Sequence, residues 1–373
     1  MDKVDISEID EIKKYSFEMG AIRPPSEGGA YSLLIRATRN CPWNRCTFCY
    51  GTPYRRAKFE LRSVEEVKGD IDAARSIMDI IVLLQRKLGG MDWVMNAIDP
   101  YTLYGRESSG LRGDDQKNYQ SIVNVFNWFC SGGKTVFLQD ANSLIMKTPQ
   151  LVEVVVYLKE TFPSIERITS YARSQTLAKK SLDELTDLKD AGLTRVHVGL
   201  ETGDDELLTY IHKGVSSEEQ ILGGRKTKEA GIELSEYVMP GLGGKAMSEQ
   251  HAKNTARVLN ETDPDFIRLR TYIPNPLTPL FKEMSSGNFE MLSPHESLNE
   301  LKIMIEDLNV TSRMTFDHAM NYWCNESFYP LFSKDYEGYK FPEEKETVLA
   351  LIEEGLAVDE SYHSRVRSQI RSL

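Results

Sequence analysis

Six short apolar segments alternate with longer segments of helical spacing, and this alternation constrains the fold more than any other feature. The strand-like segments are Tyr31–Ala37, Thr135–Gln139, Arg167–Ala172, Thr194–Leu200, Ile232–Met239 and Phe266–Ile273. The connections from helix to strand are short and carry breaker residues, which is typical of parallel βαβ units. The sequence therefore predicts an α/β fold, either an open doubly wound sheet or a barrel.

Helices are predicted between these strands and after them. The first begins at Ser63, which with Glu66 resembles a capping box, and ends at about Leu88. Further helices are expected near 119–130, 148–162, 181–191, 216–230 and 248–260, and beyond Pro276 near 294–309, 319–332 and 343–356. The polar and basic segment 361–373 is expected to fray.

The same pattern predicts how the chain is divided. We expect an N-terminal arm at 1–29, a barrel-like region at 30–279 and a C-terminal helical cap at 280–373. Residues 91–117 have no clean period and contain three glycines, so we interpret them as an insertion in the barrel-like region.

Polar residues follow nearly every predicted strand. In α/β folds chemistry collects at the C-terminal ends of the strands, so these positions are candidates for one site. They are Asp140 and Asn142, Tyr171 and Arg173, Glu201 and Thr202, Pro240 and Gly241, and Tyr272.

Three of the five cysteines, Cys41, Cys46 and Cys49, lie within nine residues directly after the first predicted strand. Thiolates are soft ligands that suit iron–sulfur clusters, and three of them leave one iron of a four-iron cluster open. A structural zinc site or a plant-type ferredoxin cluster remains an alternative, with Cys130 as the first candidate for a fourth ligand. The sequence alone leaves these alternatives open.

The composition limits the classes of function. A net charge of −11 disfavours a broad nucleic-acid groove. The sequence has no apolar run of about 18 residues that would predict a membrane helix, and its N-terminus does not resemble a signal peptide. We therefore expect a cytoplasmic protein, where clustered cysteines more often bind metal or take part in catalysis than form disulfides.

Several motifs together resemble a known family. These are Cys46-Thr-Phe-Cys49, Val198-Gly-Leu-Glu-Thr-Gly203 followed by Lys213-Gly214, Tyr237-Val-Met-Pro-Gly-Leu-Gly-Gly244, and the Pro-rich exit of Arg268–Leu280. In this order they resemble radical S-adenosylmethionine (radical SAM) enzymes, in the branch related to oxygen-independent coproporphyrinogen oxidase. The segment Asp317-His-Ala-Met-Asn-Tyr322 is similar to a pattern of a poorly characterised subgroup of that branch.

The resemblance implies a partial (β/α)6 barrel that holds one [4Fe-4S] cluster and SAM. The three cysteines would bind three irons, and the methionine group of SAM would bind the fourth. Reductive cleavage of SAM would then give a 5′-deoxyadenosyl radical that takes hydrogen from a substrate, for which a small molecule is favoured. A one-electron reductant such as flavodoxin or ferredoxin is the implied partner. The rival hypothesis is a non-catalytic electron-transfer or scaffold protein with a fourth protein ligand.

The resemblance also implies roles for single residues. Phe48 would lie near the adenine, and Glu201 would bind the ribose or ammonium of SAM, or else pair with Arg173 or Arg195. Arg173 is a candidate for the carboxylate of SAM, or forms an ion pair with Asp140 or Glu201.

Four further assignments complete this set. Gly241 would let backbone approach the adenine, or only permit a turn. Asp140, with Asn142 nearby, replaces the usual Gly-Gly-Glu as the contact to the amino group of SAM. Cys324 is a candidate hydrogen donor, or a buried thiol among aromatic residues.

The cysteine loop departs from the family pattern by one residue. Its spacing is Cys-x4-Cys-x2-Cys, whereas the commonest spacing in the family has three residues in the first gap. We expect the extra residue, among Pro42–Arg45, to be absorbed in the loop.

Overall fold

A computed structural model describes residues 6–22 and 31–370, and these form two compact units. Unit 1 comprises residues up to Arg39, Phe59–Ser170 and Asp190–Thr194, and unit 2 comprises Asn40–Lys58, Tyr171–Lys189 and Arg195–Leu373. Among the described residues, no helix combines the length and apolar character needed to cross a membrane.

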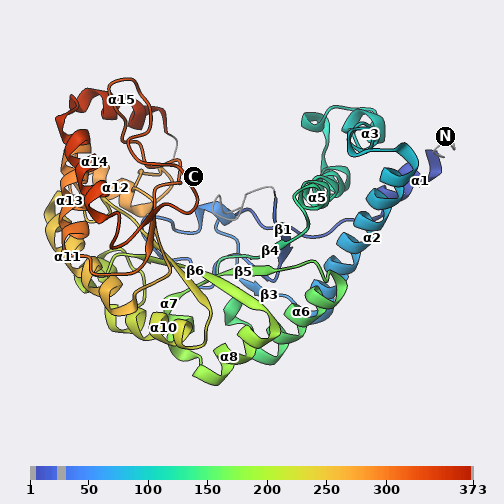
Figure 1. Cartoon of the computed structure of the whole chain (residues 1–373), viewed down its shortest axis with the longest axis horizontal. Coiled ribbons are helices and arrows are strands. Elements are labelled where there is room, and N and C mark those ends of the chain that lie inside the picture. Colours follow the sequence, from blue (N-terminus) through green and yellow to red (C-terminus); the bar gives the residue numbers. More distant parts are fainter. Residues whose placement is uncertain (1–5, 23–30, 371–373) are drawn as a thin grey trace. The chain divides into compact units, whose positions relative to one another are not determined.

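Unit 1 contains a parallel sheet in the order β1 (Leu33–Arg36), β4 (Thr135–Gln139) and β5 (Arg167–Ala172), of which β5 passes into unit 2 at Tyr171 (Figure 1). A separate antiparallel pair joins β2 (Thr38–Arg39) to β3 (Glu60–Leu61). The helices include α1 (Ile6–Glu11), α2 (Val64–Leu88), α3 (Met91–Ala97), α4 (Pro100–Tyr104), α5 (Gly113–Cys130) and α6 (Thr148–Thr161).

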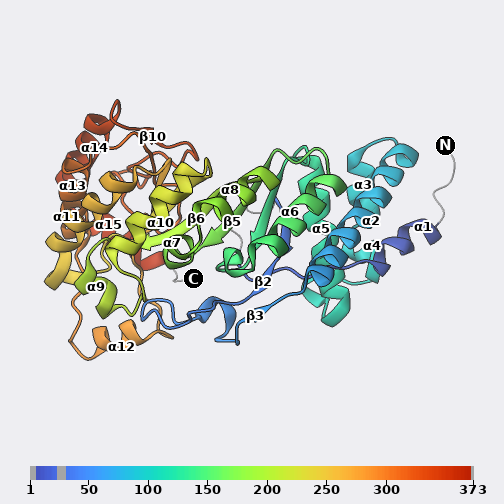
Figure 2. The same ribbon diagram turned by 90° about the horizontal axis from the view of Figure 1, so that it is seen from below.

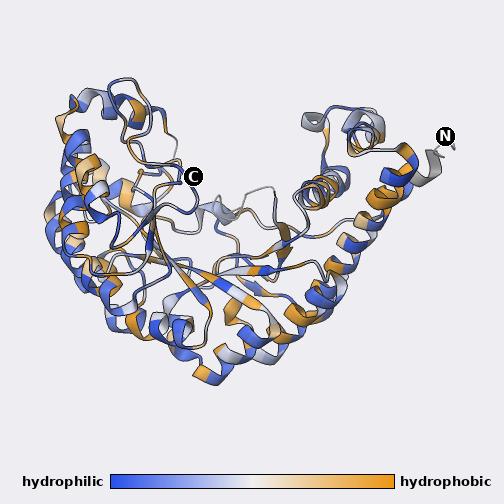
Figure 3. Cartoon of the chain, viewed as in Figure 1, coloured by the Kyte–Doolittle hydropathy of each residue, from blue (hydrophilic) through white to orange (hydrophobic). Residues whose placement is uncertain are grey.

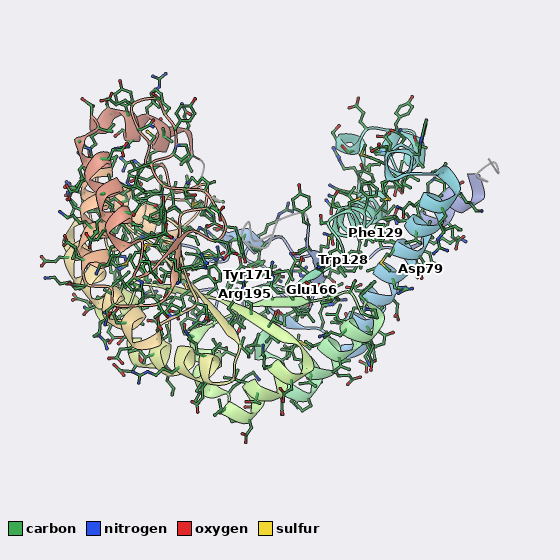
Figure 4. All side chains as sticks on the ribbon, viewed as in Figure 1. Asp79, Trp128, Phe129, Glu166, Tyr171 and Arg195 are labelled. Atoms are coloured by element: carbon green, nitrogen blue, oxygen red, sulfur yellow. The ribbon has the colours of Figure 1, made fainter. Side chains whose placement is uncertain are left out.

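The long helix α2 shows how the sequence forms unit 1. The predicted capping box is present, because Glu66 N–H donates to Ser63 Oγ at 3.1 Å while Ser63 N–H donates to the Glu66 carboxylate at 2.9 Å. Apolar residues recur every three or four positions along the helix and are buried where it packs on α5 and α6, a periodicity visible in Figure 3. Trp128 of α5, labelled in Figure 4, packs edge-to-face on Phe162, with their ring centroids 5.0 Å apart.

Unit 2 contains β6 (Leu193–Glu201, in this unit from Arg195), β7 (Glu233–Val238), β8 (Phe266–Leu269) and β9 (Arg313–Thr315) as successive parallel neighbours, with β10 (Tyr339–Lys340) antiparallel to β9. The helices α10 (Ser217–Glu229), α11 (Gly244–Thr262), α13 (Pro294–Glu306) and α14 (Lys345–Ala357) pack on one another in sequence (Figure 1). Shorter helices are α7 (Ser174–Lys179), α8 (Leu182–Ala191), α9 (Asp205–Tyr210), α12 (Pro279–Ser285) and α15 (Glu360–Gln369).

The two faces of the strands in unit 2 differ in character. One face carries the apolar residues that pack under α10, α11 and α13. The other face carries polar and aromatic side chains in contact, since the ring of His197 lies 5.8 Å from that of Tyr171 and 5.6 Å from that of Tyr237. Tyr171 and Arg195, labelled in Figure 4, belong to this second face, where Arg195 stacks on Phe266.

The α/β prediction with a mainly parallel sheet is confirmed, and all six predicted strands are present. Residues 91–117, interpreted as an insertion, contain α3 and α4, and that interpretation stays a prediction. Two details of the prediction are wrong. Residues 319–332 form no helix. The tail 361–373 does not fray over most of its length, because α15 extends to Gln369 and buries His363.

Candidate functional site

The cysteine loop of unit 2 is held by main-chain hydrogen bonds to two other segments. Thr47 N–H donates to Ile211 O at 2.9 Å, and Leu280 N–H donates to Thr47 O at 3.1 Å. The loop therefore lies between the end of α9 and the start of α12, as its blue trace shows in Figure 2. Cys46 accepts hydrogen bonds through its carbonyl from Cys49 N–H and from Tyr50 N–H, which form a tight turn between the last two cysteines.

Trp43 anchors the longer first part of the loop. Its Nε1–H donates to His212 O at 2.7 Å, and its ring lies against Gly214, where an added Cβ would come within 2.2 Å of the ring. Arg173 and Arg45 both stack on the indole, with guanidinium carbons 4.8 and 5.3 Å from the ring. The segment that contains the extra residue is thus anchored by the contacts of Trp43 with His212 and Gly214.

The thiols lie in a buried environment that contains several cations. Burial raises the pKa of Cys46 to about 11, and the charges of Lys213 and Arg173 oppose that rise. Burial also raises the pKa of Cys49, opposed by the N–H of Gly51 and by Arg270 and Lys213. Coordination deprotonates a thiol outright, and these cations stabilise the resulting thiolates.

The chemistry of the donor set suits an iron–sulfur cluster, because thiolates are the soft ligands that bind such clusters. Three half-buried thiols in one loop, surrounded by cations, suit an anionic iron–sulfur group.

Glu201 lies beside this loop in a strained conformation. Its φ of +65° is in the left-handed region, at a point where the pairing of β6 with β7 shifts register. Its carboxylate accepts a hydrogen bond from Lys213 Nζ at 2.9 Å, and Lys213 in turn lies 5.7 Å from the ring of Phe48. The pair with Lys213 was not expected from the sequence, and the expected alternative partners of Glu201, Arg173 and Arg195, stay a prediction.

Arg173 is engaged by the loop itself. Its Nη2 donates to Lys213 O at 2.6 Å, and its plane covers Trp43. Burial lowers the pKa of Arg173. These contacts support the segments that carry the cysteines, and the expected pairing of Arg173 with Asp140 or Glu201 stays a prediction.

Gly241 forms a left-handed turn after β7, with φ of +83°. Its N–H donates to Glu300 Oε1 at 2.6 Å, and Ser248 donates to the other oxygen of that buried carboxylate. Glu300 was missed by the sequence reasoning, although it lies on the buried stripe of α13 between Ser297 and Met304. A carboxylate on an apolar helical stripe is the signal that would have identified it.

Asp140 and Asn142 belong to unit 1, and both are fully buried. Arg36 holds the Asp140 carboxylate through Nε at 2.7 Å and Nη2 at 2.5 Å, and also binds Glu18. Gly20 packs so closely that an added Cβ would lie 2.0 Å from Asp140 Oδ1. Asp140 thus ties the N-terminal arm to the end of β4, and its contact with SAM stays a prediction.

The Asp317–Tyr322 motif forms a turn at the end of β9. Asp317 pairs with the buried Arg268 at 3.4 Å, and Lys334 Nζ donates to the main-chain oxygens of Phe316, His318 and Asn321. Cys324 follows in the same segment. Its thiol is buried and lies 3.7 Å from His363 Nδ1, while two of the four aromatic residues expected around it, Phe328 and Tyr329, are exposed.

Comparison with known proteins finds a similarity to one family over part of the chain. The sequence profile of the Radical SAM superfamily matches residues 109–256. The matched part runs from the residues before α5 into α11, so it lies after the cysteine loop.

Individual radical SAM matches are distant. The heme chaperone HemW of Bacillus subtilis is 22% identical over 52% of this chain and 55% of its own length, and it favours the branch that the motifs indicate. The chain therefore spans about half the length of that relative. Two solved structures are similar to parts of the chain. Methanocaldococcus infernus Elp3 is 16% identical over 59% of this chain and 53% of its own, with a TM-score of 0.42. Escherichia coli coproporphyrinogen III oxidase HemN is 17% identical over 46% of this chain and 39% of its own, with a TM-score of 0.38.

Proposed function

We propose that this chain is an enzyme that binds one [4Fe-4S] cluster through Cys41, Cys46 and Cys49 and reductively cleaves SAM. When bound, the cluster and SAM supply a one-electron cleavage that yields a 5′-deoxyadenosyl radical able to take hydrogen from a substrate. The substrate is proposed to be a small molecule. The match of residues 109–256 to the Radical SAM superfamily supports cluster and SAM chemistry in general, and the residue assignments are our own.

The observation that carries the proposal is the cysteine loop in its setting. The loop that carries the three thiols is held by the bonds of Thr47 and Trp43. The charges of Arg173 and Lys213 lower the pKa of Cys46 and so favour its thiolate. A loop that is bonded to two other segments can keep three ligands in place, which leaves a fourth iron position for SAM.

The surrounding residues are proposed to position SAM. Phe48 is proposed to provide an apolar surface for the adenine. The turn at Gly241, fixed by Glu300, is proposed to let the adenine approach backbone that carries no Cβ. Glu201 is proposed to bind the ribose or ammonium group. Because Glu201 already accepts a hydrogen bond from Lys213, its carboxylate would bind Lys213 and the SAM group at the same time.

The cysteine loop also offers a surface for a reductant. The described loop residues 40–58 contain no acidic residue, and four exposed bases lie within them, Arg45, Arg55, Arg56 and Lys58. The exposed Tyr50 stacks under Arg56 at 4.8 Å. In a chain of net charge −11 this basic segment suits an acidic one-electron donor such as a flavodoxin or ferredoxin.

Anaerobic reconstitution tests the proposed function. The protein is loaded with iron and sulfide, reduced with dithionite and mixed with SAM, and the products are separated. We expect 5′-deoxyadenosine and methionine from the wild type. A fully loaded cluster that yields neither product, and whose spectrum does not change on adding SAM, would refute the proposal.

Cysteine variants separate the proposal from its rival. Cys46→Ala is expected to abolish the four-iron spectrum, while Cys130→Ala and Cys324→Ala are expected to keep it. Cys130 is exposed on α5 and Cys324 is buried beside His363. Loss of the cluster in Cys130→Ala would favour an electron-transfer or scaffold protein with four cysteine ligands.

A further inference from the structure

Arg270 occupies a fixed position just beyond β8. Its main-chain N–H donates to Val238 O at 2.9 Å. Asn321 binds the chain on both sides of it, donating to Leu269 O at 2.7 Å and accepting from Thr271 N–H at 3.2 Å. The backbone at Arg270 is therefore tied both to the end of β7 and to the Asp317–Tyr322 turn.

Among the described residues, the structure records no acceptor for the guanidinium of Arg270, in contrast to two other arginines of unit 2. Arg268 pairs with Asp317, and Arg173 donates to a main-chain oxygen. Within residues 6–22 and 31–370, the structure records no hydrogen bond or ion pair for the Arg270 guanidinium, and its Nε is shielded from solvent. A buried donor of a charged group is destabilising without an acceptor, so this position calls for an explanation.

His318 supplies a second donor close to Arg270. Its Nδ1 accepts a hydrogen bond from Met320 N–H at 3.2 Å, and burial, with the charges of Arg270 and Lys334, lowers the pKa of the imidazole to about 3. The ring is therefore neutral with its proton on Nε2. Two groups that can only donate thus lie near one another at the end of the strands.

We propose that Arg270 and His318 bind an acidic group, a carboxylate or a phosphate, of the substrate. A guanidinium binds such planar or tetrahedral oxoanions through parallel hydrogen bonds, and the imidazole Nε2–H adds a third donor. The charge of Arg270 also acts on Cys49, so the bound group would lie near the cysteine loop.

This inference rests on the proposed function for its choice of ligand. In that function the carboxylate of SAM already has the open iron as its partner. The Arg270–His318 pair is built partly from the C-terminal segment, outside the six βα units that bind the cofactor. We therefore assign the acidic group to the substrate and take the substrate to be an anionic small molecule.

Binding of simple anions tests the assignment without turnover. The reconstituted full-length protein, with saturating SAM, is titrated calorimetrically with tricarballylate and, separately, with inorganic pyrophosphate at constant ionic strength. We expect saturable binding of at least one anion. Arg270→Gln should weaken it by roughly tenfold or more, because a charge-assisted hydrogen bond is lost.

Three variants control for a general effect of charge. Arg270→Lys keeps the charge and should bind with intermediate affinity, and His318→Phe keeps the volume and should bind more weakly than the wild type. Arg313→Gln removes a half-buried arginine of β9 that pairs with Glu337, and should bind as the wild type does. Equal losses in Arg270→Gln and Arg313→Gln would overturn the site.

The dependence on SAM identifies the source of the acidic group. The titration is repeated without SAM. If an anion binds in the absence of SAM and not in its presence, the pair belongs to the carboxylate of SAM, and the assignment to substrate is overturned. Absence of binding by either anion in the wild type would also overturn it. Both results are independent of 5′-deoxyadenosine formation, so they leave the proposed function to its own test.

Discussion

Replacing Gly214 by alanine tests whether the cysteine loop depends on the place that Trp43 occupies. Gly214 has a φ of +67°, and a Cβ built there would lie 2.2 Å from the Trp43 ring. The indole cannot move away freely, because its Nε1–H is bonded to His212 O and two arginines stack on its faces. The substitution should therefore displace the segment that carries Cys41 and Cys46.

The magnitude follows from two separate costs. A left-handed conformation costs an alanine about 1 kcal/mol relative to glycine. Overpacking against the indole adds about 1–3 kcal/mol. Gly231→Ala is the matched control, because Gly231 has a similar φ of +75° and its Cβ would meet only Lys189 at an ordinary 3.8 Å. The difference between the two variants isolates the contact with Trp43.

Both variants are compared by chemical denaturation and by iron content after reconstitution. We expect Gly214→Ala to lose more stability than Gly231→Ala and to bind less iron. Adding Trp43→Leu to Gly214→Ala should restore part of the stability, which a double-mutant cycle would measure. Equal losses of stability and iron in the two alanine variants would refute the role given to Trp43.

Three further predictions concern other parts of the chain. Burial raises the pKa of Glu236 to about 8, so the folded state keeps a proton that the unfolded chain releases above pH 4.5, and stability should fall between these pH values by about 1.4 kcal/mol per pH unit. Glu236→Gln should remove that slope in urea unfolding at pH 5 and pH 8, and an unchanged slope would contradict it. Replacing Arg55, Arg56 and Lys58 by glutamate should slow reduction by an acidic flavodoxin about tenfold at low salt and leave dithionite-driven SAM cleavage intact. Replacing the exposed control residues Arg225, Lys253 and Arg257 by glutamate should leave the rate of reduction by flavodoxin unchanged. Lys334→Met removes donors to three main-chain oxygens and should cost about 2–3 kcal/mol; faster hydrogen exchange at residues 316–321 would support this, and unchanged exchange would count against it.

The predicted strands and long helices were found because their signals are local. Ser63 and Glu66 sit three residues apart and cap α2 without help from the rest of the chain. The six strands are apolar runs bounded by breakers, which a sequence displays directly. Residues 319–332 misled the same reasoning because their apolar residues have helical spacing, whereas bonds from Asn321 and Lys334 to the main chain fix an irregular path.

The candidate site divides in the same way. The three cysteines are visible from their spacing, and Glu201 from its place after a strand. Lys213 and Arg270 gain their importance only from the residues that folding brings beside them. Lys213 donates to Glu201, whereas Arg270 has no recorded acceptor among the described residues. Such partners depend on long-range contacts, which no local pattern specifies.

The main-chain bonds of Thr47 have a consequence for how the cysteine spacing can vary in evolution. These bonds use peptide groups, so they persist whatever side chain occupies position 47. The chain from Cys46 onward is thereby fixed independently of the stretch before it. Insertions or deletions between Cys41 and Cys46 are then tolerated when the new stretch can pack on the fold, and in this chain the missing side chain of Gly214 leaves room for the indole of Trp43.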